Sequence, residues 1–104
     1  MKTPMSHIPP QLPSGLEAYK RTPEFTPDNL PPALQTSHST KPGVWGLLHV
    51  LAGQVIYRLA PPYEQSTIAN AGDSIVILPE IVHSVEFGSP GRFYVEFYRA
   101  PTSD

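Results

Sequence analysis

The fold of this chain is decided by residues 74–99, which read SIVILPEIVHSVEFGSPGRFYVEFYR. Short runs of Ile, Val, Phe and Tyr in this stretch are each bounded by Pro, Gly or Ser. Such β-branched and aromatic runs between turn residues predict strands rather than helices. We therefore predict strands near residues 74–78, 82–87 and 92–99.

The same pattern extends back along the chain to Leu34. It predicts further strands near residues 34–38, 44–51, 54–59 and 66–69, separated by turn residues such as those at 41–43, 52–53 and 70–73. Nothing in the sequence predicts a long helix. Several short antiparallel strands must bury their apolar faces against one another, so the predicted fold is all-β, either a sandwich or a small closed barrel.

Composition narrows the class of protein. The chain has 104 residues, a formal net charge of -2, 14 prolines and no cysteine. This size predicts one domain, and the lack of cysteine excludes a disulfide scaffold. A nucleic-acid binder needs clustered Lys and Arg, which the sequence does not show, and no apolar run approaches the length of a membrane span. We expect neither a nucleic-acid nor a membrane partner, and a cytoplasmic location.

Prolines concentrate in the first 32 residues, where they disfavour a helix. We predict a Pro-rich tail over residues 1–14 and a single β-barrel domain over residues 15–104. In the start of that domain Leu16, Tyr19 and Phe25 supply apolar surface for an extended segment that lies over the core.

The last two predicted strands bring a histidine and a carboxylate together. If the loop from Gly88 to Gly91 joins them as a hairpin, the antiparallel register places His83 opposite Glu96 on one face. The pair then forms either a hydrogen bond that stabilises the sheet or part of a metal or acid–base site.

Which face of the last strand points inward stays open at this point. Arg92, Tyr94, Glu96 and Tyr98 alternate with Phe93, Val95 and Phe97. The apolar set can form the core and leave the polar set in solvent. Alternatively, the polar set lines a pocket inside a small barrel.

Four blocks of the sequence resemble a known family. They are residues 19–23 (YKRTP), 38–46 (HSTKPGVWG) with its continuation to 53, 79–83 (PEIVH) and 92–99 (RFYVEFYR). Over roughly residues 16–99 the chain resembles the tellurite-resistance TehB-like, or YeaR-like, domain of the cupin superfamily. The resemblance implies a double-stranded β-helix, also called a jelly-roll barrel, which usually can hold one metal ion in its mouth.

The resemblance also implies site residues. The second cupin motif places a His eleven positions after a Gly, as His83 follows Gly72 here. The first cupin motif matches poorly and the usual set of four ligands is incomplete. His38, His83 and Glu96 can still assemble a predicted metal site of two imidazoles and one carboxylate, a set that suits Zn, Fe, Ni or Mn. The predicted ligand pocket adds five residues, which are Tyr94, Tyr98, Arg92, Glu80 and Lys41. Of these, Glu80 and Lys41 are more readily explained as solvated turn residues. His49 and Trp45 are expected on another surface, and His49 is left out of the metal set.

The leading functional hypothesis is a stand-alone domain, without the methyltransferase part to which family members can be fused. It binds a divalent metal and a small polar or anionic ligand, such as an oxyanion or an organic acid, and serves tellurite or other stress response. One alternative is a metal-dependent enzyme, an oxygenase or isomerase, and another is a metal-free sensor or interaction module. Exposed Trp45, Phe93 and Phe97 further predict a homodimer.

Overall fold

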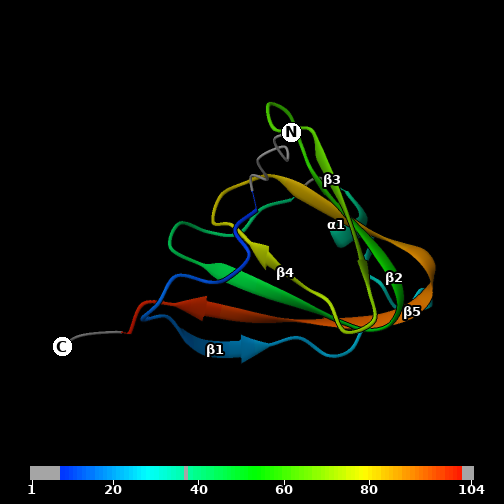
Figure 1. Cartoon of the computed structure of the whole chain (residues 1–104), viewed down its shortest axis with the longest axis horizontal. Helices are drawn as coiled ribbons and strands as arrows, with labels where there is room; N and C mark the ends of the chain where they lie inside the picture. The colour runs from blue at the N-terminus through cyan, green and yellow to red at the C-terminus, as the bar shows by residue number, and fades with distance from the viewer. Residues whose placement is uncertain (1–7, 37, 102–104) are drawn as a thin grey trace, which may run out of the picture.

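A computed structural model describes residues 8–36 and 38–101 and shows one antiparallel five-stranded sheet that folds over itself (Figure 1). The elements, in chain order, are β1 (Glu17–Arg21), α1 (Pro32–Gln35), β2 (Trp45–Leu59), β3 (Gln65–Asn70), β4 (Ser74–Ile77) and β5 (His83–Arg99). The strand order is β1-β5-β2-β3, and β4 pairs with β2. The all-β, cupin-like fold class is confirmed.

The two long strands β2 and β5 pair along most of their length and carry the architecture. Their register shifts between Val50 and Val55, and there the sheet bends into two arms. One arm adds β1 and β4, the other adds β3 (Figure 1). The bend lets the sheet enclose its own apolar face.

Two predicted turns are therefore wrong. The break at residues 52–53 and the hairpin loop from Gly88 to Gly91 both lie inside continuous strands. Gly53 has a φ of +69°, and a Cβ on Gly53 or Gly91 would collide with the backbone of the other bend. Glycine here allows close approach of two bulged strands instead of ending them.

The core fills the inside of the fold and comes from alternate positions of β2, β4 and β5. Its most buried members include Leu48, Val55, Tyr57 and Phe93, which are fully buried. Phe25 and Phe87 pack on Phe93, with ring centroids 5.5 and 5.4 Å apart. These buried residues show which face of β5 points inward. Phe93 and Val95 face the core, and Tyr94, Glu96 and Tyr98 face outward.

The N-terminal part of the domain lies against β5, as an extended segment. β1 pairs with its C-terminal half, and Phe25 then forms a two-way backbone bridge with Phe93. Over residues 34–36 the strand predicted near residues 34–38 is wrong, because Pro32 begins the single-turn helix α1, and residue 37 lies outside the described residues. Proline at the first helical position has the φ that a helix needs, so a Pro-Pro pair here starts a helix.

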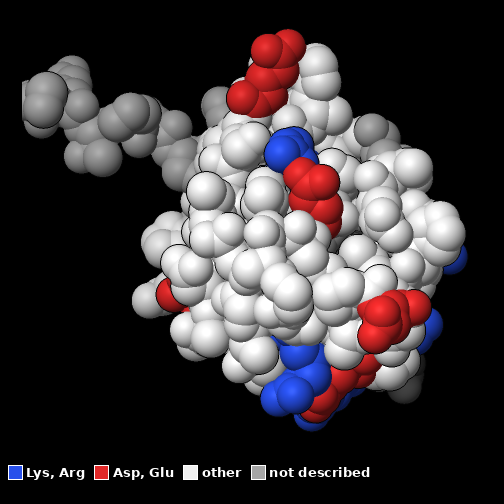
Figure 2. Space-filling view, turned by 90° about the vertical axis from the view of Figure 1, so that its right-hand side faces the viewer, with Lys and Arg blue, Asp and Glu red and all other residues white. Residues whose placement is uncertain are grey.

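Charges on this protein are few and mixed. On the face drawn in Figure 2 the coloured Lys and Arg atoms lie beside Asp and Glu atoms and form no basic stripe. Arg58 pairs with Glu86 and Arg92 pairs with Glu24. Among the described residues no helix has both the length and the apolar character needed to cross a membrane.

Candidate functional site

His38 and His83 lie side by side although they are far apart in the sequence. Their backbones form an antiparallel bridge, in which each N–H donates to the other's carbonyl at 2.9 and 2.7 Å. Their rings meet edge to face, with centroids 4.2 Å apart. The structure thus brings together two of the three predicted metal ligands.

Both imidazoles present the same unsatisfied atom. The Nδ1–H of His83 donates to the carbonyl of Ile81, and the Nδ1–H of His38 donates to the carbonyl of Thr36, each at 2.9 Å. A neutral imidazole that donates from Nδ1 carries its lone pair on Nε2. Within the described chain neither Nε2 has a hydrogen-bond partner, so both are free to accept one.

Burial keeps His83 neutral. The residue is 3% exposed. Loss of hydration lowers the pKa of its imidazole to about 4, the bond to the Ile81 carbonyl opposes this shift, and the nearby His38 adds to it. At neutral pH the His83 ring is an acceptor and not a cation.

A cavity of about 360 Å³ opens next to this pair. Its walls are mostly apolar and include Phe25, Leu48, Phe93, Val95 and Phe97 from the folded sheet and the segment after β1. Predominantly apolar walls with a few polar groups are typical of small-molecule sites.

The charged residues that line the cavity are both lysines. Lys20 and Lys41 line it together with the two histidines, and no described Asp or Glu belongs to its lining. Neither lysine forms an ion pair with any described residue. The hydroxyl of Thr40 is already committed, because it donates to the Val44 carbonyl at 2.7 Å.

Glu96 does not join the two histidines. The hairpin register that placed it opposite His83 is wrong: His83 pairs with Leu59 and Glu96 pairs with Leu47, because both halves of β5 pair with β2. Glu96 projects from the outer face and accepts a hydrogen bond from His49 Nε2 at 2.7 Å.

The other predicted pocket residues also do not all lie at the cavity. Lys41 lines the cavity, whereas Tyr94, Tyr98, Arg92 and Glu80 do not. Tyr94 stacks on the outward-facing His49, with ring centroids 4.7 Å apart.

The group around His49 was not predicted from the sequence. His49 was correctly expected out of phase with Leu48 and Val50, but no partner was assigned to it on that face. The usable signal was the register of β2 against β5, in which His49 lies opposite Tyr94 and two pairs away from Glu96, on the same face.

Comparisons with known proteins give the family. A family model described as the TehB-like domain matches residues 20–95. The chain belongs to the TehB-like domain family. A crystal structure of a protein from E. coli (strain K12) is 27% identical, has a TM-score of 0.82 and is matched over 88% of this chain and 98% of its own.

Other relatives are longer proteins. The crystal structure of TehB from Haemophilus influenzae is 33% identical, with a TM-score of 0.76, over 84% of this chain and 32% of TehB. In sequence, a probable S-adenosyl-L-methionine-dependent methyltransferase TehB from H. influenzae (strain ATCC 51907 / DSM 11121 / KW20 / Rd) is 50% identical over 40 residues. That alignment spans 38% of this chain and 14% of the methyltransferase.

The residues present do not fit the predicted three-ligand metal site. Glu96 is held by His49 on the outer face, and no carboxylate of the described chain lines the cavity beside His38 and His83. Across residues 8–36 and 38–101, no cluster of three or more His, Asp or Glu side chains is placed to hold a metal ion. Two imidazole nitrogens are what this site offers.

Proposed function

We propose that this TehB-like domain is a binding module that holds a small organic anion in the cavity beside His38 and His83. The observation that carries the proposal is the lining of that cavity, where Lys20 and Lys41 lie beside apolar walls and have no acidic partner among the residues that the structure describes. An unpaired cation next to a desolvated surface favours a negatively charged group, and the apolar walls favour a hydrocarbon body.

The histidines add a second requirement for the ligand. Because the neutral His83 ring accepts at Nε2, it attracts a hydroxyl or N–H group and offers nothing to a bare oxyanion. The ligand class that meets all three features is a monocarboxylate with an apolar body and one further donor, such as a hydroxy acid. Inorganic oxyanions, tellurite included, satisfy only the lysines.

Metal binding stays a prediction. A Zn²⁺ or other transition-metal ion would take the Nε2 atoms of His38 and His83 as its protein ligands and would need the rest of its coordination from water or from the bound anion. No reaction is assigned to the cavity, and a role in stress response remains a prediction of the same kind.

The test is a thermal-shift and calorimetric comparison of matched ligands. Mandelate should bind most tightly, phenylacetate more weakly, and the uncharged phenylacetamide and the cation phenethylamine not measurably. Tellurite and Zn²⁺ are titrated separately. Equal binding of the carboxylate, the amide and the amine would contradict the proposal, and saturable Zn²⁺ binding lost in His83→Gln would support the metal prediction.

Substitutions locate the binding. Lys20→Met and Lys41→Met should each weaken mandelate binding about two- to fivefold, the loss expected for one exposed ion pair. Arg58→Gln is the matched control, because Arg58 is a cation on the other arm of the sheet and does not line the cavity. If Arg58→Gln weakens binding as much as the lysine substitutions, attraction is to net charge and not to this cavity.

A further inference from the structure

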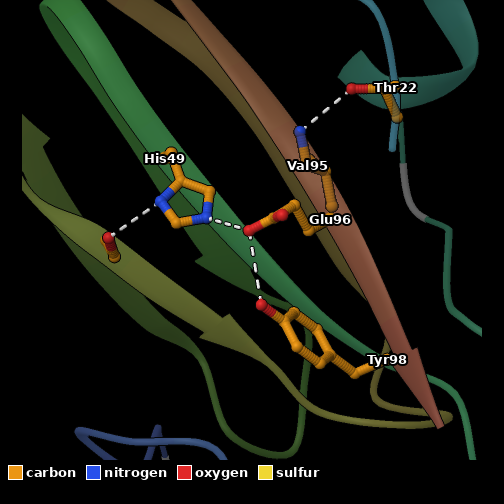
Figure 3. Close-up of polar contacts among 6 residues, drawn as sticks. Thr22, His49, Val95, Glu96 and Tyr98 are labelled. Carbon is orange, nitrogen blue, oxygen red and sulfur yellow. Dashed lines mark hydrogen bonds and ion pairs between the residues drawn. The ribbon is translucent and has the colours of Figure 1, made fainter. Parts of the chain in front are cut away.

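A second group of polar side chains is connected on the outer face of the sheet. The Ser74 hydroxyl donates to His49 Nδ1 at 3.3 Å, His49 Nε2–H donates to Glu96 Oε1 at 2.7 Å, and the Tyr98 hydroxyl donates to the same oxygen at 3.3 Å. Figure 3 shows the imidazole between its two partners, with the Glu96 carboxylate shared by His49 and Tyr98. The bonds form one chain from a hydroxyl to a carboxylate.

The residues of this hydrogen-bonded group come from three paired strands. His49 on β2 lies opposite Ser74 on β4 and opposite Tyr94 on β5. Tyr94 stacks on the imidazole, and the Arg21 guanidinium lies 3.9 Å above the Tyr94 ring. The side chains of His49 and Glu96 are only 24% and 27% exposed, so neighbours hold them in place.

We propose that Ser74, His49 and Glu96 form a nucleophilic relay that accepts an acyl group from an activated ester. Glu96 accepts the Nε2–H and thereby fixes the tautomer in which Nδ1 is the base, and Nδ1 faces the Ser74 hydroxyl. The carboxylate also stabilises the imidazolium that forms when the serine proton is transferred. Tyr98 positions the carboxylate.

The backbone supplies a donor for the developing oxyanion. Val50 N–H donates to the Asp73 carbonyl at 3.0 Å, which makes His49 and Ser74 a non-hydrogen-bonded pair. The Ser74 N–H therefore points away from β2. In the described part of the chain β4 pairs only with β2, so this N–H lies at an open edge beside the Ser74 hydroxyl.

The chemistry balances in two steps. Ser74 Oγ attacks the ester carbonyl, His49 Nδ1 takes the hydroxyl proton, and the carbonyl oxygen becomes the oxyanion. Collapse breaks the bond to the leaving alkoxide, which receives that proton, and leaves an acyl-serine. Water then attacks the acyl-serine with His49 again as base, and this releases the carboxylic acid and restores Ser74.

The open position of Ser74 sets the substrate class. The residue is exposed and lies outside the lining of the cavity, so the relay does not depend on the anion site proposed above. With one backbone donor and no enclosing pocket, we expect reaction with small activated acyl esters and not with amides.

Covalent labelling tests the relay. The protein is incubated with a fluorophosphonate probe, and the modified serines are located and timed by peptide mass spectrometry. Ser74 should be labelled at least about tenfold faster than Ser66, an exposed strand serine that has no histidine partner among the described residues. His49→Gln should abolish the difference, and Glu96→Gln should reduce it.

The release of nitrophenolate from p-nitrophenyl acetate gives a second readout. It should be lost in Ser74→Ala and unchanged in Ser66→Ala. Equal labelling of Ser74 and Ser66 in the unmodified protein would overturn the proposal without relying on any variant. Labelling of Ser74 that persists at full rate in a folded His49→Gln protein would overturn it as well.

Discussion

Burial of His83 should make this protein lose stability as the pH falls below neutral. The folded pKa of about 4 lies below the value of 6.5 for the free imidazole, so the unfolded chain binds the proton more tightly. Unfolding therefore becomes easier as the pH falls from about 6.5 to about 4. Between pH 7 and pH 5 this one group lowers the free energy of unfolding by about 2 kcal/mol, and by pH 4 by about 3 kcal/mol.

Urea unfolding followed by the fluorescence of Trp45 measures this effect, because the chain has a single tryptophan. The wild type and His83→Gln are compared at pH 7 and pH 5, so that contributions from the carboxylates common to both proteins cancel. His83→Gln should lose about 2 kcal/mol less than the wild type over this interval. The reasoning is refuted if both proteins lose the same free energy.

Four further outcomes are expected. Phe93→Ala should cost about 3–5 kcal/mol of stability in the same urea assay, because the ring is fully buried against two other aromatic rings. Gly53→Ala should cost more than the roughly 1 kcal/mol expected for Gly43→Ala, since both have positive φ but only Gly53 would also collide with backbone; equal losses would count against the bend argument. Tyr57→Phe should be neutral or stabilising by about 1 kcal/mol, because the buried Tyr57 hydroxyl has no partner among the described residues. The predicted homodimer requires a mass of twice 11.4 kDa in sedimentation equilibrium, and a monomer at all concentrations would refute it.

The strand content was predicted well from the sequence, because strand formation here follows the strand propensity of neighbouring residues. Runs of β-branched and aromatic residues in the second half of the chain all became strands, and the alternation of Phe93 and Val95 with Tyr94 and Glu96 defined two faces. The structural role of two glycines was predicted wrongly. In sequence Gly53 and Gly91 have the same appearance whether they end a strand or let two bent strands approach, and only the long-range pairing of β2 with β5 decides between these outcomes.

The site was harder to predict than the fold for a related reason. His38 and His83 lie together, as the predicted site requires, but only His83 was placed by the family resemblance, and their role as metal ligands stays a prediction. The partner of Glu96 was wrong because a local hairpin was assumed where the true neighbour of β5 is a strand from the middle of the chain. Tautomers and pKa values depend on such contacts, and they are invisible until the register is known.

Alternation along β5 separates the two proposed sites. Successive side chains of a strand point to opposite faces, so the residues that line the cavity, Phe93 and Val95, are interleaved with Tyr94 and Glu96, which build the outer relay. The two sites therefore share no side chain. They are linked through backbone alone, because β2 carries both Leu48 of the cavity and His49, β4 carries both Ile77 and Ser74, and β5 carries both Val95 and Glu96. In this arm β2 is paired with β4 and β5, and β5 is paired with β1 and β2, and this pairing resists movement of the backbone. The two sites should consequently act independently, and each proposal stands or falls on its own experiment.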